Sequence, residues 1–196
     1  MTVKFLGLKI KITFLFSALI CLMLFIDRTG LIIPLMLAVS VHELAHIAAM
    51  KMLDCAPSEI ELVPGSIKII NPQKYDRRKE NIILLCGPLS NLLLFIVFYL
   101  GFVFCGYKRL LVFSAVELVV ALFNLLPAKG LDGGALLYNF LLKITSVLRA
   151  TLFFLIISVF TGTFFLSFGI LCAGSGNLNP SLIILGLYII ILSFFK

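Results

Sequence analysis

The chain contains only two histidines, and both lie in the segment His42-Glu43-Leu44-Ala45-His46. On a helix, residues i and i+4 lie about 40° apart around the axis and one turn apart along it, so both imidazoles face a single point where a zinc ion can bind. Glu43, next in sequence to the first histidine, can reach a metal-bound water and take its proton. The pentapeptide therefore predicts a zinc site with Glu43 as its base.

The same pentapeptide arises by chance in large soluble proteins, or as a buried hydrogen-bonded cluster without a metal. Here it lies inside an apolar segment, residues 31–53. Ionisable side chains within a membrane each cost on the order of a few kcal/mol unless they are partnered. A segment that carries a glutamate and two histidines at this spacing therefore favours metal binding.

A catalytic zinc ordinarily has three protein ligands and one open position, so a third ligand is needed. Beyond the early loops, three acidic residues lie in or next to apolar segments, namely Glu43, Glu117 and Asp132. Asp132 follows Pro127, which ends or kinks a helix. An unwound segment after Pro127 can bring Asp132 to the metal.

The composition predicts a membrane protein. The chain has 196 residues, of which 62% are hydrophobic and 13% charged, and its mean hydropathy is +1.19. With about 20 apolar residues needed to cross a bilayer, the length allows about six membrane helices. The segments that we expect to span are residues 10–26, 31–53, 82–105, 110–126, 152–173 and 180–195. The expected fold is an all-α polytopic membrane protein that forms a single membrane domain over residues 1–196.

The net charge of +7 does not indicate a nucleic-acid-binding protein, because the basic residues flank apolar segments instead of forming a polar face with exposed aromatics. Of the 16 basic residues, all but Arg28, Lys108 and Arg109 are expected on one side of the membrane. The positive-inside tendency then places both termini in the cytoplasm. The five cysteines show no CxxC spacing and predict neither a disulfide framework nor a metal site.

Two short elements are expected outside the spans. Residues 59–63 and 67–69 alternate between polar and apolar types on either side of Pro64-Gly65-Ser66, which predicts a small β-hairpin at the cytoplasmic surface. Residues 135–144 are expected to lie along the membrane interface.

Together, the pentapeptide at His42 and the downstream Asn124-Leu125-Leu126-Pro127 and Leu131-Asp132-Gly133-Gly134 resemble the site-2 protease family of intramembrane metalloproteases. Gly87-Pro88-Leu89-Ser90-Asn91 is similar to a small-residue, Asn-containing segment of that family. The resemblance covers residues 31–134. It implies a three-helix catalytic core in that range, with Asp132 as the third zinc ligand and residues 10–26, 152–173 and 180–195 as accessory helices.

Within the family, the chain is most similar to the compact members that process sporulation transcription-factor precursors, because a short hairpin and no PDZ domain separates the second and third spans. Two departures are visible. We expect no CBS domain after the last apolar segment, and Gly130 stands where a second proline is often found.

Several further residues have two interpretations. Asn124 either positions the substrate backbone or stabilises the developing oxyanion, or it caps the end of a broken helix. Glu117 shares a helix face with Asn124 and is expected to accept a hydrogen bond from Asn91 in preference to a catalytic role. Gly87 is expected to allow close helix approach.

The sequence thus predicts an intramembrane zinc metalloprotease of the cell membrane, in which Glu43 takes a proton from water and returns it to the leaving amine. The expected partners are a membrane-embedded or membrane-associated protein substrate and the lipid bilayer, with an inhibitory membrane partner and a homo-oligomer left open. The alternative is a non-catalytic zinc-binding scaffold or metal-handling protein, which has no need of Glu43. A transporter ranks last, because the last two apolar segments are nearly free of ionisable groups.

Overall fold

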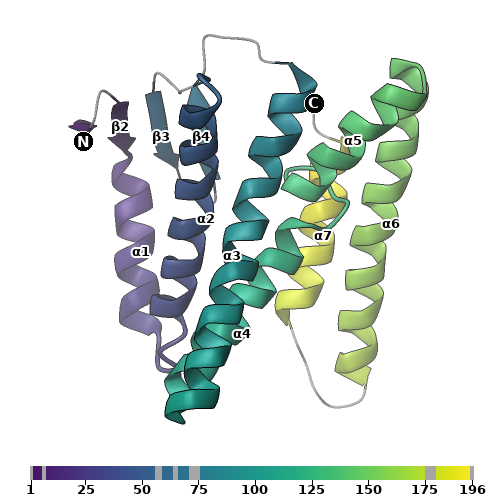
Figure 1. Ribbon diagram of the computed structural model, residues 1–196. Helices are drawn as coiled ribbons and strands as arrows, with labels where there is room; N and C mark the ends of the chain where they lie inside the picture. Colours follow the sequence, from purple (N-terminus) through teal and green to yellow (C-terminus); the bar gives the residue numbers. More distant parts are fainter. Residues whose placement is uncertain are drawn as a thin grey trace. The chain divides into compact units, whose positions relative to one another are not determined.

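A computed structural model describes residues 2–5, 8–55, 59–63, 66–70, 76–174 and 180–194. These residues form seven helices and four short strands (Figure 1). The chain divides into two compact units, Met1–Ala121 and Leu122–Lys196, and each is described by itself.

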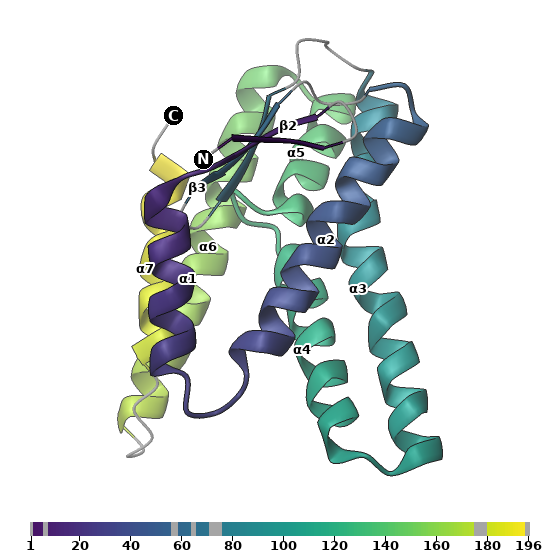
Figure 2. The same ribbon diagram turned by 90° about the vertical axis from the view of Figure 1, so that its left-hand side faces the viewer.

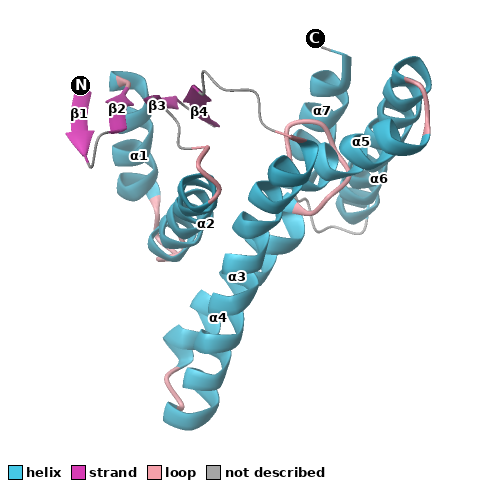
Figure 3. Cartoon of the chain, turned by 45° about the horizontal axis from the view of Figure 1, so that its top comes forward, coloured by secondary structure: helices cyan, strands magenta, loops and turns pink. Residues whose placement is uncertain are grey.

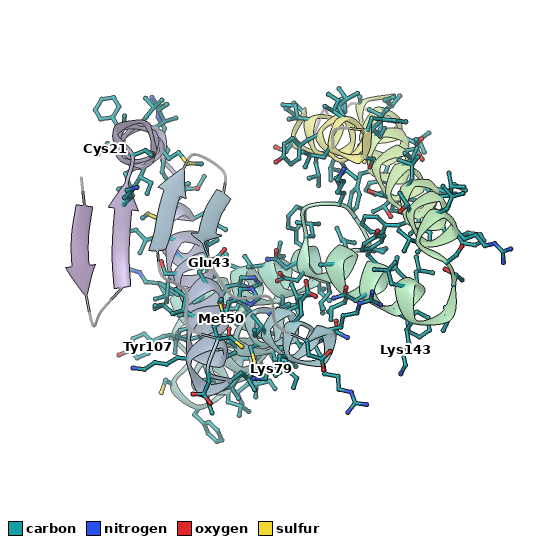
Figure 4. All side chains as sticks on the ribbon, turned by 90° about the horizontal axis from the view of Figure 1, so that it is seen from above. Cys21, Glu43, Met50, Lys79, Tyr107 and Lys143 are labelled. Atoms are coloured by element: carbon teal, nitrogen blue, oxygen red, sulfur yellow. The ribbon has the colours of Figure 1, made fainter. Side chains whose placement is uncertain are left out.

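The first unit contains helices α1 (Phe14–Ile26), α2 (Ile32–Met52), α3 (Arg77–Cys105) and most of α4 (Lys108–Asn124). Helices α2 and α3 lie side by side (Figure 2). Ala49, Met50 and Ile83 form a buried apolar cluster between them. At the same end, the Lys79 ammonium donates a hydrogen bond of 2.8 Å to the Leu53 carbonyl, one of the carbonyls left open where α2 ends (Figure 4).

Four strands form one sheet in the order β1-β2-β3-β4, with bounds Thr2–Phe5, Leu8–Ile12, Glu59–Val63 and Ser66–Ile70 (Figure 3). The predicted hairpin corresponds to β3 and β4, which pair antiparallel, while its turn residues Pro64 and Gly65 lie outside the described residues. Strand β2 pairs parallel to β3. The expectation of a helix from residue 10 is therefore wrong, because Leu8–Ile12 alternates with period two and pairs with a distant strand.

The second unit contains α5 (Asp132–Ile144), α6 (Val147–Gly174) and α7 (Pro180–Phe194). Helices α6 and α7 pack closely where both carry glycine. A Cβ atom on Gly186 would lie 2.6 Å from the Leu166 nitrogen and 2.7 Å from the Gly162 carbonyl oxygen. Such close backbone approach is typical of helix pairs in membranes. The interfacial segment expected at 135–144 is part of α5, which begins three residues earlier.

Among the described residues, three helices are long and apolar enough to cross a membrane, namely α2, α3 and residues Val147–Ala173 of α6. They indicate a membrane protein. The prediction of six spans is not supported, because α1, α4 and α7 have 13, 17 and 15 residues, fewer than the roughly 20 that a straight crossing needs. The expected segment 10–26 overestimated the length of α1, whereas 110–126 and 180–195 are close in length to α4 and α7 and were counted as spans although they are short.

Candidate metal centre

The two histidines lie together on one face of α2. His42 and His46 are both buried, with 4% and 5% of their surface exposed, and their Nε2 atoms are 3.1 Å apart. Ala38, Ala49 and Met50 are buried on the same helix. The spacing of four residues has therefore brought the imidazoles to a common point, as the sequence predicted.

Helix α3 presents three positions spaced four residues apart to this pair, namely Ile83, Gly87 and Asn91, all of which are buried. Residues four apart on a helix form a stripe along one face. This stripe contributes a backbone carbonyl, a position without a side chain and an amide. Each has a separate effect on the imidazoles.

Gly87 leaves the space that the rings occupy. A Cβ atom at this position would lie 2.5 Å from Nε2 of His46 and 2.7 Å from Cε1 of His42. These separations are well inside van der Waals contact, which begins near 3.5 Å for carbon atoms. The close approach expected of Gly87 is therefore an approach to the imidazoles themselves.

Both histidines are held through Nδ1. Nδ1 of His46 is 2.8 Å from the Ile83 carbonyl oxygen, and Nδ1 of His42 is 2.8 Å from Oδ1 of Asn91. Both of these oxygens can only accept, so each Nδ1 must carry the ring proton. In a neutral imidazole the other nitrogen, Nε2, then carries a lone pair instead of a proton.

The arrangement fits a metal ion. Two lone pairs that face each other at 3.1 Å repel unless a cation lies between them. A zinc ion bound tetrahedrally at about 2.0–2.1 Å holds two such nitrogens about 3.3 Å apart. Histidine ligands of zinc also commonly donate their second ring N–H to a carbonyl or carboxylate, as both rings do here.

Asn91 links His42 to Glu117. The Asn91 amide nitrogen donates one bond of 2.6 Å to Oε2 of Glu117 on α4 and another of 2.9 Å to the Ala38 carbonyl on α2. Asn91 and Glu117 are both fully buried, with 0% exposure. The predicted hydrogen bond between these two side chains is thus confirmed.

Glu43 is half-buried on α2, directly after His42 (Figure 4). The two other predicted site residues belong to the second unit. Asn124 is the last residue of α4 and Asp132 the first of α5, and both are half-buried.

The turn before Asp132 is tightly folded on α5. A Cβ atom on Gly133 would collide with the Leu125 carbonyl, and one on Gly134 with the Ala128 carbonyl, so both glycines are required by the close return of the chain. Gly130 has a φ of +88°, which proline, with its φ fixed near −65°, cannot adopt. Glycine in place of the second proline at position 130 is therefore compatible with the left-handed backbone conformation found there.

The residues that hold this turn were not predicted from the sequence. The Lys129 amide donates a bond of 3.0 Å to Oγ of Ser158 on α6, and that hydroxyl lies 2.7 Å from Oγ of Ser193 on α7. Ser193 in turn donates to the Ile189 carbonyl. Isolated serines in apolar helices were the only sequence signal, and they do not identify a backbone partner.

A scan against protein-family models finds no match to this chain, and a search of curated proteins finds none either. Among solved structures, the chain is similar to the site-2 protease from Methanocaldococcus jannaschii, with 26% identity and a TM-score of 0.70. The similarity covers 98% of this chain and 93% of that chain. Likeness over nearly the full length of both proteins, together with a buried histidine pair suited to a metal, supports the site-2 protease family.

Proposed function

We propose that this chain is an intramembrane zinc metalloprotease of the site-2 type. The observation that carries the proposal is the buried pair of imidazoles on α2, whose Nδ1 atoms both face acceptors, so that both Nε2 lone pairs face one point. The similarity to a site-2 protease supports proteolysis as the use of this point.

We assign His42 and His46 as two zinc ligands and Asp132 as the third. The assignment of Asp132 is supported by its Leu-Asp-Gly-Gly setting and by ligand chemistry, since two imidazoles and one carboxylate are a known catalytic set with one position open. When bound, zinc supplies a Lewis acid for the scissile carbonyl and a water that ionises near neutral pH.

Glu43 is the residue that moves protons. It follows His42 directly, so its carboxylate comes from the same turn of α2 that holds the ligand. A carboxylate there can accept a proton from water and later donate it to the leaving amine. Asn124, at the end of α4, is proposed to orient the substrate backbone through its amide.

The substrates we propose are membrane-embedded or membrane-associated proteins, including transcription-factor precursors of the sporulation type. The chain would act as a multi-pass protein of the cell membrane with both termini in the cytoplasm, which the position of its basic residues supports. An inhibitory membrane partner and self-association complete the proposal for its partners.

A zinc-binding scaffold is the competing function, and Glu43 discriminates between the two. We would purify the wild-type chain and the variants Glu43→Gln and Glu80→Gln, assay zinc in each, and test cleavage of co-expressed membrane precursors. Glu80 lies in the first turn of α3 and serves as a matched control for loss of one carboxylate. All three should bind about one zinc.

Cleavage by the wild type and Glu80→Gln, but not by Glu43→Gln, is the expected result. If the wild type binds zinc and cleaves none of the precursors, the scaffold function is favoured. A wild-type chain without zinc would contradict the metal centre itself.

A further inference from the structure

A continuous chain of buried hydrogen bonds runs from α4 through α3 to the first histidine. Oε2 of Glu117 accepts a bond of 2.6 Å from the Asn91 amide nitrogen, and Oδ1 of Asn91 lies 2.8 Å from Nδ1 of His42. The exposed fractions are 0%, 0% and 4% for Glu117, Asn91 and His42. All three residues belong to the first unit.

Burial of Glu117 requires an explanation. A buried carboxyl group costs several kcal/mol unless its oxygens are satisfied. Oε1 of Glu117 has no hydrogen-bond partner among the described residues. The hydrogen bond that the carboxyl group does make, through Oε2, is the one to Asn91. A leucine would fill similar space without this cost, which argues that the acceptor at this position serves a purpose other than stability.

The purpose follows from the two ends of the Asn91 amide. Its nitrogen faces two acceptors, Oε2 of Glu117 and the Ala38 carbonyl, so its oxygen must face His42. If the amide turned around, its oxygen would face both acceptors and its nitrogen would donate to Nδ1 of His42. The ring proton would then move to Nε2, where it blocks a metal.

We propose that Glu117 is a positioning residue that acts through Asn91 to keep the proton of His42 on Nδ1 and so presents Nε2 to the metal. His46 needs no such device, because the Ile83 carbonyl cannot turn around to become a donor. The proposal rests on the metal centre of the proposed function, but it concerns the state of one imidazole.

The direct test is the tautomer of each histidine. Because the chain has only two histidines, protein labelled with ¹⁵N-histidine contains only four ring nitrogens, and their NMR shifts report which nitrogen carries the proton. In zinc-free wild-type protein we expect both rings to be protonated at Nδ1. In Glu117→Leu we expect the His42 proton to shift to Nε2 in part of the molecules, while His46 remains unchanged and shows that the fold is intact.

Two further variants separate the acceptor from general packing. Glu117→Gln keeps an acceptor oxygen and should retain the wild-type tautomer. Ser114→Ala removes another buried polar group of α4, one that lies three residues from Glu117, and should leave both histidines unchanged. If Glu117→Leu disturbs His46 as well, its fold is altered and Glu117→Gln becomes the deciding variant. An altered His42 tautomer in Glu117→Gln would overturn the proposal.

Zinc affinity gives the second readout, measured by competition with a chelator. Loss of such an outer partner of a ligand typically weakens metal binding about 10- to 100-fold, and we expect this range for Glu117→Leu. Weaker binding with an unchanged His42 tautomer would overturn the proposal, since it would reflect packing alone. Absence of proteolysis in an otherwise positive experiment would contradict the proposed function and leave the role of Glu117 standing.

Discussion

Adding one methyl group at Gly87 should disable the histidine pair. A Cβ atom there would lie 2.5 Å from Nε2 of His46, 2.6 Å from Cε1 of the same ring and 2.7 Å from Cε1 of His42. Since van der Waals contact begins near 3.5 Å, the rings must move by about 1 Å. Metal-binding and catalytic sites tolerate displacements of their side chains of only about 0.5 Å.

The loss of zinc affinity can be estimated from the energetic cost of overpacking an interior. Inserting a methyl group into a packed interior costs roughly 1–3 kcal/mol. In zinc-free protein the imidazoles can rotate away and relieve much of this cost, whereas bound metal fixes them. The cost therefore appears as weaker zinc binding, by about 5- to 150-fold at 1.4 kcal/mol per factor of ten. Replacing glycine by alanine inside a helix meanwhile stabilises it by about 0.5–1 kcal/mol.

The assay is chelator competition on Gly87→Ala and on Gly101→Ala, a matched control in the same helix. A Cβ atom on Gly101 would meet only the flexible end of Leu110, at 3.3 Å. Both variants gain the same helical preference, so the two zinc-free variants should unfold at similar temperatures. Only Gly87→Ala should lose zinc affinity.

Wild-type zinc affinity in Gly87→Ala would refute this reasoning, because it would mean that α3 does not approach the imidazoles at this position. Equal losses in both variants would also refute it, since the loss would then follow from any change of glycine in α3.

Two further predictions concern the loops. Ser158→Ala removes the acceptor of the Lys129 amide and should speed hydrogen exchange of that amide about fivefold, for a bond worth about 1 kcal/mol; unchanged exchange contradicts the bond. The Ile32 amide and the Thr29 hydroxyl lower the pKa of Asp27 from 3.8 to about 2, so its stabilising effect is complete above pH 4 and is lost as the pH falls through about 2. A carboxyl ¹³C titration of Asp27 with a midpoint near 3.8 would contradict this.

The sequence was sufficient to predict features that depend on local helix geometry. The spacing of His42 and His46 fixes their common direction on any helix, and the structure confirms it. The bond between Asn91 and Glu117 was predicted because each residue is polar in an apolar segment, and such groups need partners. The ligand role of Asp132, in contrast, stays a prediction of the motif.

The sequence was insufficient to predict contacts in which a residue pairs with a backbone group or with a strand distant in the chain. The Ile83 carbonyl supports His46, but every residue has a carbonyl, so the sequence gives no sign of it. Residues 10–12 of β2 were included in the first expected helix because apolar residues continue from there into α1, and the partner strand β3 lies about fifty residues away in the chain. The number of spans was overestimated for a different reason, since short apolar segments such as those of α4 and α7 were counted as crossings of the bilayer.

The stripe on α3 has a consequence for mutational scanning. Of its three contributions to the imidazoles, only the Asn91 amide can be deleted by conversion to alanine. Ile83→Ala removes packing and keeps the carbonyl that holds His46, and at Gly87 alanine is an addition that reports a collision. An alanine scan would therefore score three different effects as if they were one: loss of packing at Ile83, a collision at Gly87 and loss of a hydrogen-bonding amide at Asn91. Replacing the amide after Ile83 by an ester would instead weaken the Ile83 carbonyl as an acceptor without altering any side chain.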